Sequence, residues 1–228
     1  MSDYLSIEYA EDKRPLTTYP EKLALYLFKE FGLSRGQSIL EVGSGRSELL
    51  QQFSNLGLIT YAIDSAPSAE DFALQAGAKF ELYEFSPDKT SNPFLGMKFD
   101  VVFSKSFIEH ISQPIDYFEW CQTVLKDGGK LISLTPDWEA NFKIFYDDVT
   151  HVKPFTQVSL KQTLEITNFE NIRVFRFRQL PLTWENSFIL FLSRVTGIFS
   201  HHRAKNKWFR WSRELMIASV GVYSEDKG

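Results

Sequence analysis

At 228 residues, with 43% hydrophobic and 24% charged residues, the chain is long enough to form one large α/β domain with a substantial core. Its formal net charge of −4 argues against a general nucleic-acid binder, because such proteins need an excess of Lys and Arg facing phosphates. The only cysteine, Cys121, excludes an intramolecular disulfide, and the polar N-terminus predicts no signal peptide, so we expect a cytoplasmic protein.

Helices and strands are predicted to alternate through the first half of the chain. A helix over 21–31 opens with Pro20 in its first turn and carries apolar residues at helical spacing. A second helix carries Leu49, Leu50 and Phe53 toward the core. Four strands are predicted here, over 38–42, 59–64, 79–85 and 99–104.

The second half continues this alternation up to one interruption. One helix starts at Pro114 and ends at Gly128-Gly129, and another starts at a capping box at Ser159 and runs to about Thr167. Three further strands are predicted, over 130–134, 171–178 and 215–223. The alternation implies a mainly parallel, doubly wound sheet, so residues 1–228 are interpreted as a single domain. Residues 182–213 break the pattern and are predicted to form a small inserted helical subdomain.

A glycine turn between the first strand and the next helix is typical of a nucleotide site. In the segment SILEVGSGRSELL (38–50), Gly43 and Gly45 can take positive φ and let a ligand approach the backbone. The crevice at the carboxyl ends of parallel strands is where nucleotides bind in doubly wound sheets. Asp64 ends the next strand, where its carboxylate can accept hydrogen bonds from ribose hydroxyls.

The charges around this turn indicate which nucleotide binds. A dinucleotide site needs a third glycine beside the pyrophosphate, and Glu48 stands at that position, where a carboxylate would repel phosphate. Glu41, before the turn, suits a ligand that carries an ammonium or sulfonium charge. S-adenosylmethionine has both charges and no phosphate, so the electrostatics favour it over NAD.

Taken together, these segments resemble the class I S-adenosylmethionine-dependent methyltransferases. Residues 41–45 match the family motif E/D-x-G-x-G-x-G, with Ser47 in place of the third glycine, and the segments 99–102, 108–111 and 125–131 resemble later family motifs. The resemblance implies a Rossmann-like, seven-stranded sheet with an antiparallel last strand. It also implies S-adenosylmethionine as cofactor, bound by Glu41, Gly43, Ser44, Gly45, Asp64, Ser65, Glu84, Phe85 and Ser104.

Methyl transfer to oxygen requires a base, and His is the side chain best suited to that role near neutral pH. His110 follows the fourth strand at the edge of the crevice. His151 belongs to a polar loop that resembles the D-x-T-H-x-x-P-x-T segment of bacterial methyltransferases acting on sugars or other small molecules. We favour His110 as the base, and the reverse assignment stays open. The predicted substrate-binding residues are Asp148, Thr150 and Tyr146.

The histidines, the single cysteine and a basic, aromatic segment indicate which metals and partners to expect. The four histidines are scattered and one cysteine is insufficient, so no metal site is predicted. The stretch from His201 to Arg213 is basic and aromatic, and it follows an apolar run over 188–199 that is too short to span a bilayer. Three interpretations stay open for 182–213: a clamp for a phosphate-bearing acceptor, weak contact with a membrane surface through 188–213, or a hairpin packed on the sheet with a solvated basic face.

The sequence thus predicts an O-methyltransferase that acts on a sugar, a nucleotide-linked sugar or another small metabolite. A role in polysaccharide or secondary-metabolite biosynthesis is implied by the resemblance alone. Two alternatives stay open: N-methylation of an amino-sugar or amine, and a non-catalytic nucleotide-binding partner protein. No nucleic-acid partner is expected, and the oligomeric state is left open.

Overall fold

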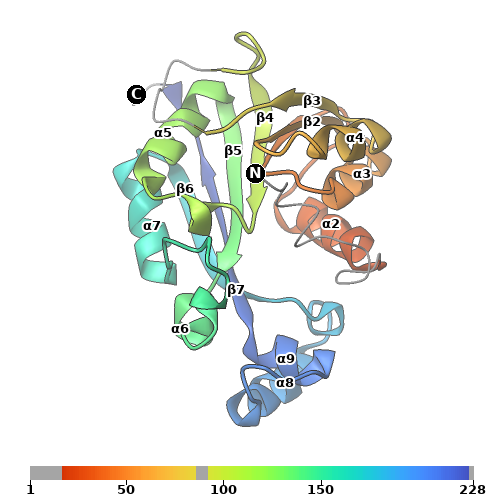
Figure 1. The fold of residues 1–228 in the computed structure, drawn as a ribbon, viewed down its shortest axis with the longest axis vertical. Helices are drawn as coiled ribbons and strands as arrows, with labels where there is room; N and C mark the ends of the chain where they lie inside the picture. The colour runs from red at the N-terminus through yellow and green to blue at the C-terminus, as the bar shows by residue number, and fades with distance from the viewer. Residues whose placement is uncertain (1–16, 86–91, 226–228) are drawn as a thin grey trace.

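A seven-stranded sheet organises the chain in the computed structural model, which describes residues 17–85 and 92–225 (Figure 1). The strand order is β3-β2-β1-β4-β5-β7-β6. The strands are β1 Ser38–Val42, β2 Ile59–Asp64, β3 Lys79–Leu82, β4 Phe99–Lys105, β5 Leu125–Pro136, β6 Glu170–Arg178 and β7 Leu215–Val222. Strands β1 to β5 pair in parallel, whereas β7 is antiparallel to both β5 and β6. The predicted seven-stranded, mainly parallel sheet with an antiparallel last strand is therefore confirmed.

Helices cover both faces of this sheet. The helices of the described residues are α2 Tyr19–Glu30, α3 Glu48–Asn55, α4 Ala69–Gln75, α5 Pro114–Val124, α6 Trp138–Asn141, α7 Gln157–Ile166, α8 Ser187–Phe199 and α9 Lys207–Arg213, with 3-10 turns η1 Ile108–His110, η2 Phe145–Asp147 and η3 Pro181–Thr183. Every residue of β1 is buried, and its side chains alternate: Ile39 packs in the core cluster of α2 and α3, whereas Leu40 and Val42 pack in that of α5 and α7. Two cores thus enclose the sheet.

Several predicted boundaries differ from the observed ones, and tertiary contacts explain the differences. The helix that starts at Pro114 ends at Val124 instead of at Gly128-Gly129, because Leu125 already pairs with Phe99 at the start of β5. The capping box of α7 is centred on Thr156, which accepts from the Ser159 N–H at 3.1 Å, so Ser159 is the third helical residue and not the cap. Strand β3 ends at Leu82, before the predicted Phe85.

The segment between β6 and β7, where a helical insertion was predicted over 182–213, forms η3, α8 and α9 (Figure 1). Figure 1 shows α8 and α9 at one end of the molecule, beyond the start of β7. None of the helices in the described ranges has the length and apolarity that crossing a bilayer requires. The segment MSDYLSIEYAEDKR, from which the absence of a signal peptide was predicted, lies outside the described residues.

Candidate functional site

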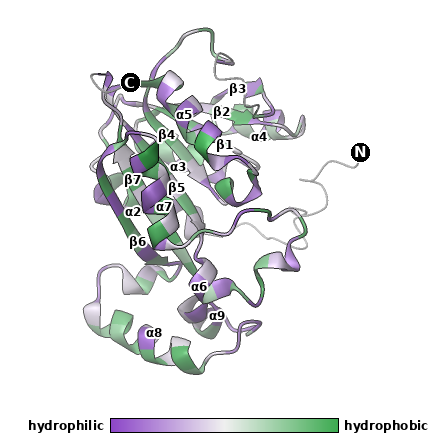
Figure 2. Cartoon of the chain, turned by 90° about the vertical axis from the view of Figure 1, so that its left-hand side faces the viewer, coloured by the Kyte–Doolittle hydropathy of each residue, from purple (hydrophilic) through white to green (hydrophobic). Residues whose placement is uncertain are grey.

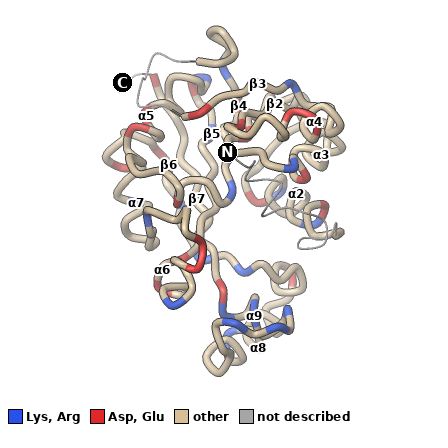
Figure 3. Tube along the Cα trace, viewed as in Figure 1, with Lys and Arg blue, Asp and Glu red and all other residues tan. Residues whose placement is uncertain are grey.

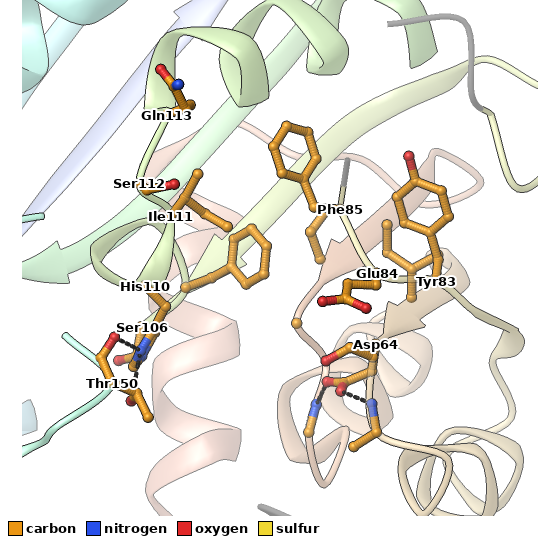
Figure 4. Close-up of a pocket in the computed structure, with 17 residues that line it drawn as sticks. Asp64, Tyr83, Glu84, Phe85, Ser106, His110, Ile111, Ser112, Gln113 and Thr150 are labelled. Atoms are coloured by element: carbon orange, nitrogen blue, oxygen red, sulfur yellow. Dashed lines mark hydrogen bonds between the residues drawn. The ribbon is translucent and has the colours of Figure 1, made fainter. Parts of the chain in front are cut away.

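A cavity of about 570 Å³ opens at the carboxyl ends of β1, β2 and β4 (Figure 4). Six of the predicted cofactor-binding residues line it: Gly43, Gly45, Asp64, Ser65, Glu84 and Phe85. Figure 4 shows Asp64 and Glu84 on one side of the cavity and His110 with Thr150 on the other. The topology explains why residues so far apart in sequence line one cavity, because the loops that follow parallel strands converge at one edge of the sheet.

Hydrogen bonds from Gly43 and Gly45 hold the glycine turn against the end of β2. The Gly43 N–H donates to the Ile63 carbonyl at 2.9 Å, and the Gly45 N–H donates to Asp64 Oδ2 at 2.8 Å. Asp64 Oδ1 accepts from the Ala66 N–H, also at 2.8 Å. Gly43 has a φ of +71°, and a Cβ there would lie 2.5 Å from the Phe107 ring, so backbone and packing both require glycine.

Glu41 is a buried carboxylate on β1, just before this turn. Burial raises the pKa of Glu41 to about 8; nearby Lys105 opposes this rise and Asp64 adds to it. Its Oε2 has no hydrogen-bond partner among the described residues. A cationic ligand group beside Glu41 would favour its ionised form, and such a contact is the role that the sequence predicted for this residue.

Three predicted cofactor residues do not line the cavity themselves. Glu41 and Ser44 are buried next to residues that do, and Ser104 lies within the sheet, where its hydroxyl donates to Ser133 Oγ at 3.1 Å. Ser104 points into the interior because side chains alternate along β4, and the cavity is instead reached by Ser106 and Phe107 beyond the strand's end. The residues that reach the cavity after β4 thus lie two and three positions beyond the predicted Ser104.

The lining of the cavity tests whether S-adenosylmethionine fits. Among the described residues, the lining includes two carboxylates, Asp64 and Glu84, and neither Lys nor Arg. Tyr83 and Phe85 supply aromatic rings at the same edge, and Phe85 contacts Tyr117 edge-on. A pyrophosphate would meet carboxylates without a compensating cation, whereas a positively charged nucleoside would be stabilised. The residues present therefore fit S-adenosylmethionine.

His110 and His151 lie side by side at the inner edge of this cavity, with ring centroids 4.8 Å apart. His110 Nδ1 lies 3.1 Å from the Thr150 carbonyl oxygen, and His151 Nδ1 lies 2.6 Å from that of Phe145. A carbonyl can only accept, so both Nδ1 atoms carry a hydrogen, and the lone pair of a neutral ring is then on Nε2. Burial and the neighbouring His151 lower the pKa of His110, which favours its neutral form.

The loop after η2 is folded back so that the two histidines meet. The Glu109 carbonyl accepts from the Val152 and Lys153 N–H groups, both at 2.9 Å. Asp148 accepts from the backbone N–H and the hydroxyl of Thr150, and its Oδ2 lies 3.8 Å from His151 Nε2. Two predicted substrate residues thus have structural partners here: Asp148 orients Thr150, and Thr150 contacts His110 Nδ1.

A second, smaller cavity of about 160 Å³ lies on the far side of the histidine pair. His151 and Phe145 line it, and Ser106 lines both cavities. Tyr146, the third predicted substrate residue, lines neither; its side chain is 59% exposed and packs edge-on against Trp138. The histidines therefore stand between a large acidic cavity and a small mixed one.

Glu109 is a site residue whose role sequence reasoning missed. It is fully buried, its Oε2 accepts from the Thr135 hydroxyl at 2.9 Å, and its Oε1 has no partner among the described residues. Burial raises its pKa to about 7. An acid between two isoleucines, in Ile108-Glu109-His110-Ile111, was the available signal.

Glu109, His110 and His151 each offer a ligand atom, and these atoms lie within 4.8 Å of one another. Two imidazoles and a carboxylate are ligands that divalent metals accept. His110 and His151 are distant in sequence and adjacent in space, so the spacing of the histidines along the chain is no argument against a metal site. These three residues could hold a metal ion.

Comparison with known proteins gives related sequences and folds. Residues 10–174 match the family model described as a methyltransferase domain. The chain is 30% identical over 105 residues to a ubiquinone biosynthesis O-methyltransferase of Roseobacter denitrificans, a match that covers 44% of this chain but only 42% of that enzyme. It is 25% identical over 196 residues to the enzyme of the same name from Coxiella burnetii (strain RSA 331), covering 84% of this chain and 79% of the other.

The fold also matches solved structures. A SAM-dependent methyltransferase from Archaeoglobus fulgidus superposes with a TM-score of 0.67 at 18% identity, over 97% of this chain and 100% of that one. At this identity the match supports the fold, and the family rests on the sequence match over 10–174.

Proposed function

Because the chain belongs to the methyltransferase domain family and uses S-adenosylmethionine, we propose that it methylates a hydroxyl group on a small ring compound. The observation that carries the proposal is the histidine pair. Both imidazoles are fixed through Nδ1, and His110 lines the larger cavity whereas His151 lines the smaller one, so a neutral ring at either place can accept a proton on Nε2. An oxygen acceptor needs such a base, whereas a neutral amine already has a lone pair for attack.

In the proposed complex the larger cavity holds the cofactor. Asp64 binds the ribose hydroxyls, Phe85 packs against the adenine, and the Glu41 carboxylate stabilises the ammonium group. The bound cofactor supplies a methyl group made electrophilic by its sulfonium sulfur. The acidic lining without Lys or Arg among the described residues supports this placement.

His110 is proposed to take the proton of the acceptor hydroxyl on its Nε2. The ring then becomes an imidazolium, and its Nδ1–H remains bonded to Thr150. The Thr150 hydroxyl in turn donates to Asp148, so a carboxylate lies one residue away from the new positive charge. Thr150 and Asp148 act as positioning residues, and His151 orients the acceptor from the second cavity.

The second cavity favours a small acceptor. Its volume is about 160 Å³, and its lining combines apolar residues with polar ones. The apolar residues include Pro136, Ile144 and Phe145, and the polar ones include Asn141, Gln179 and Glu214. Such a lining accommodates a single ring with one or two hydroxyl groups. The relatives named as O-methyltransferases support transfer to oxygen. A free sugar fits this description as well as a phenol does, whereas a nucleotide would have to remain outside.

The test is a turnover assay on paired acceptors, in which phenols, sugars and matched amines are compared by release of S-adenosylhomocysteine. We expect methylation of hydroxyl acceptors, and His110→Ala should lower turnover by roughly 10²–10⁴-fold while calorimetry shows unchanged cofactor affinity. His201→Ala, an exposed histidine after α8, is the matched control and should behave as wild type.

Two results would contradict the proposal. Turnover on amines alone that survives loss of both His110 and His151 would indicate an N-methyltransferase. Tight cofactor binding without turnover on any acceptor would indicate a partner protein. A greater loss for His151→Ala than for His110→Ala would instead exchange the roles of the two histidines.

A further inference from the structure

Helix α8 exposes its apolar side. Its large apolar side chains recur at intervals of three and four residues, and their exposed fractions run from 38% at Val195 to 84% at Phe199. They are Phe188, Phe191, Leu192, Val195, Ile198 and Phe199. We call these six residues the apolar stripe. Figure 2 shows hydrophobic segments along α8 at the end of the molecule. A surface helix normally turns such a stripe toward the core, so its exposure indicates a binding surface.

The opposite side of α8 carries small residues and packs closely against α9. Ser193 and Gly197 are the buried residues of this helix, and Ser193 Oγ lies 2.9 Å from Ser212 Oγ. A Cβ on Gly197 would lie 2.4 Å from the Ser212 carbonyl oxygen, so the two backbones are in close approach. This contact fixes the rotation of α8 and holds the apolar stripe outward.

The insertion that carries the stripe is also basic. From Ser187 to Arg213 the sequence holds six Lys and Arg residues and no Asp or Glu, whereas the whole chain has a net charge of −4. Figure 3 shows these residues gathered on the α8–α9 end of the molecule. Arg203 pairs with Asp147 and Arg210 with Glu214, whereas Arg194, Lys205 and Lys207 are exposed.

We propose that α8 and α9 dock the protein on an anionic membrane surface. The apolar stripe enters the boundary between headgroups and acyl chains, and the Lys and Arg residues contact the headgroups. Helix α8 has 13 residues, fewer than the roughly 20 that span a bilayer, so it lies in the plane of the interface. A second copy fits this face less well, because a two-fold contact would bring two clusters of positive charge together.

The docking surface adjoins the second cavity. Helix α9 ends at Arg213, and the next residues, Glu214 and Leu215, line that cavity. The Arg203–Asp147 pair connects the loop before α9 to η2, whose Phe145 also lines it. If the proposed function holds, docking places the acceptor cavity next to the bilayer, where it can receive an amphiphilic acceptor. The docking itself does not depend on that function.

The test is co-sedimentation of the full chain with vesicles of phosphatidylcholine alone or mixed with phosphatidylglycerol. We expect binding to the mixed vesicles that falls as salt is raised, and at least about tenfold weaker binding to phosphatidylcholine alone. The double variant Phe188→Ser/Phe191→Ser should lower partitioning at least about tenfold, because it removes apolar area from the stripe. Lys205→Glu/Lys207→Glu should lower it by about fivefold or more per charge.

The matched control is Val158→Ser/Ile166→Ser on α7, where the two side chains are 66% and 63% exposed. It should bind vesicles as wild type does, and all variants should keep the wild-type melting temperature. Absence of vesicle binding would overturn the proposal, as would equal binding by the stripe variant or a solution dimer that this variant dissociates. Vesicle binding in a protein that methylates no acceptor would refute the proposed function and leave the docking intact.

Discussion

The Asp64 carboxylate links the end of β2 to the glycine turn, since its two oxygens accept from the N–H groups of Gly45 and Ala66. A carboxylate has about four acceptor sites, so it can also accept from ligand hydroxyls. Asp64→Ala should therefore weaken binding of S-adenosylhomocysteine by about 1.5–3 kcal/mol, measured by calorimetry. Asp64→Asn keeps one acceptor oxygen and should lose less. Unchanged affinity in Asp64→Ala would refute the ribose placement.

Ser47 stands where the family motif has its third glycine, and two features of this serine lower the stability of the fold. Its φ is +53°, a left-handed conformation that costs a non-glycine residue about 1–2 kcal/mol. Its buried hydroxyl also lacks a partner among the described residues. Ser47→Gly should raise the free energy of unfolding by about 1 kcal/mol, after the entropy of glycine in the unfolded chain is subtracted.

Urea unfolding measures this change. Ser47→Ala is the control, since it removes the hydroxyl and keeps the backbone strain, and it should gain less than Ser47→Gly. A glycine variant no more stable than wild type would contradict the account of strain at this turn.

The sequence predicted those site residues that lie next to a strand end and missed those that depend on distant contacts. Gly43, Gly45 and Asp64 follow from the strand–turn–helix pattern, because that local order fixes where they lie. The meeting of His110 with His151 depends on the Glu109 carbonyl, which holds a loop that is distant in sequence. No local pattern encodes such a contact.

At the scale of whole elements, the number and order of the strands were predicted, whereas the ends of β3, β5 and α5 were not. The extent of β2 agrees with the prediction because its run of apolar residues is buried along most of its length. The end of α5 was misplaced because Gly128-Gly129 is a valid helix stop, but pairing of Leu125 with Phe99 ends the helix earlier. Tertiary pairing therefore overrode a sound local signal.

Helix α8 offers a prediction about its contact with α9. Gly197→Ala adds a Cβ within 2.4 Å of the Ser212 carbonyl oxygen, which is backbone and cannot move alone, so the helices must separate. Amide hydrogen exchange in α8 should become faster, although alanine favours the helix itself. Val195→Ala, on the exposed side of α8, is the control and should leave the amide hydrogen exchange of α8 unchanged. Unchanged exchange in Gly197→Ala would contradict the close approach.

At the scale of the whole molecule, the outward face of α8 could not be derived from its sequence. Apolar residues at 188, 191, 192 and 195 have the spacing of a helix that faces a core. The orientation is decided by the small residues Ser193 and Gly197, which allow α9 to approach so closely that the small side becomes the inner one. The position and basic charge of the insertion were predicted, and its packing was not.

The buried carboxyl of Glu41 should couple the stability of the whole molecule to pH. Its pKa is raised from 4.5 to about 8 in the folded protein, chiefly by burial, so between these pH values the folded state binds a proton that the unfolded state has lost. The stabilising contribution is complete below pH 4.5 and is lost as pH rises through about 8.

Glu41→Gln replaces this group with a neutral side chain of the same shape, so its stability relative to wild type should increase from pH 5 to pH 8. The increase should be on the order of a few kcal/mol, at about 1.4 kcal/mol per pH unit at most. Urea unfolding at pH 5, 6.5 and 8 measures it, with the exposed Glu81→Gln as control. Because Glu109 titrates in both proteins, only the difference between them reports on Glu41. A difference that stays constant across this range would show that Glu41 is ionised in the folded protein.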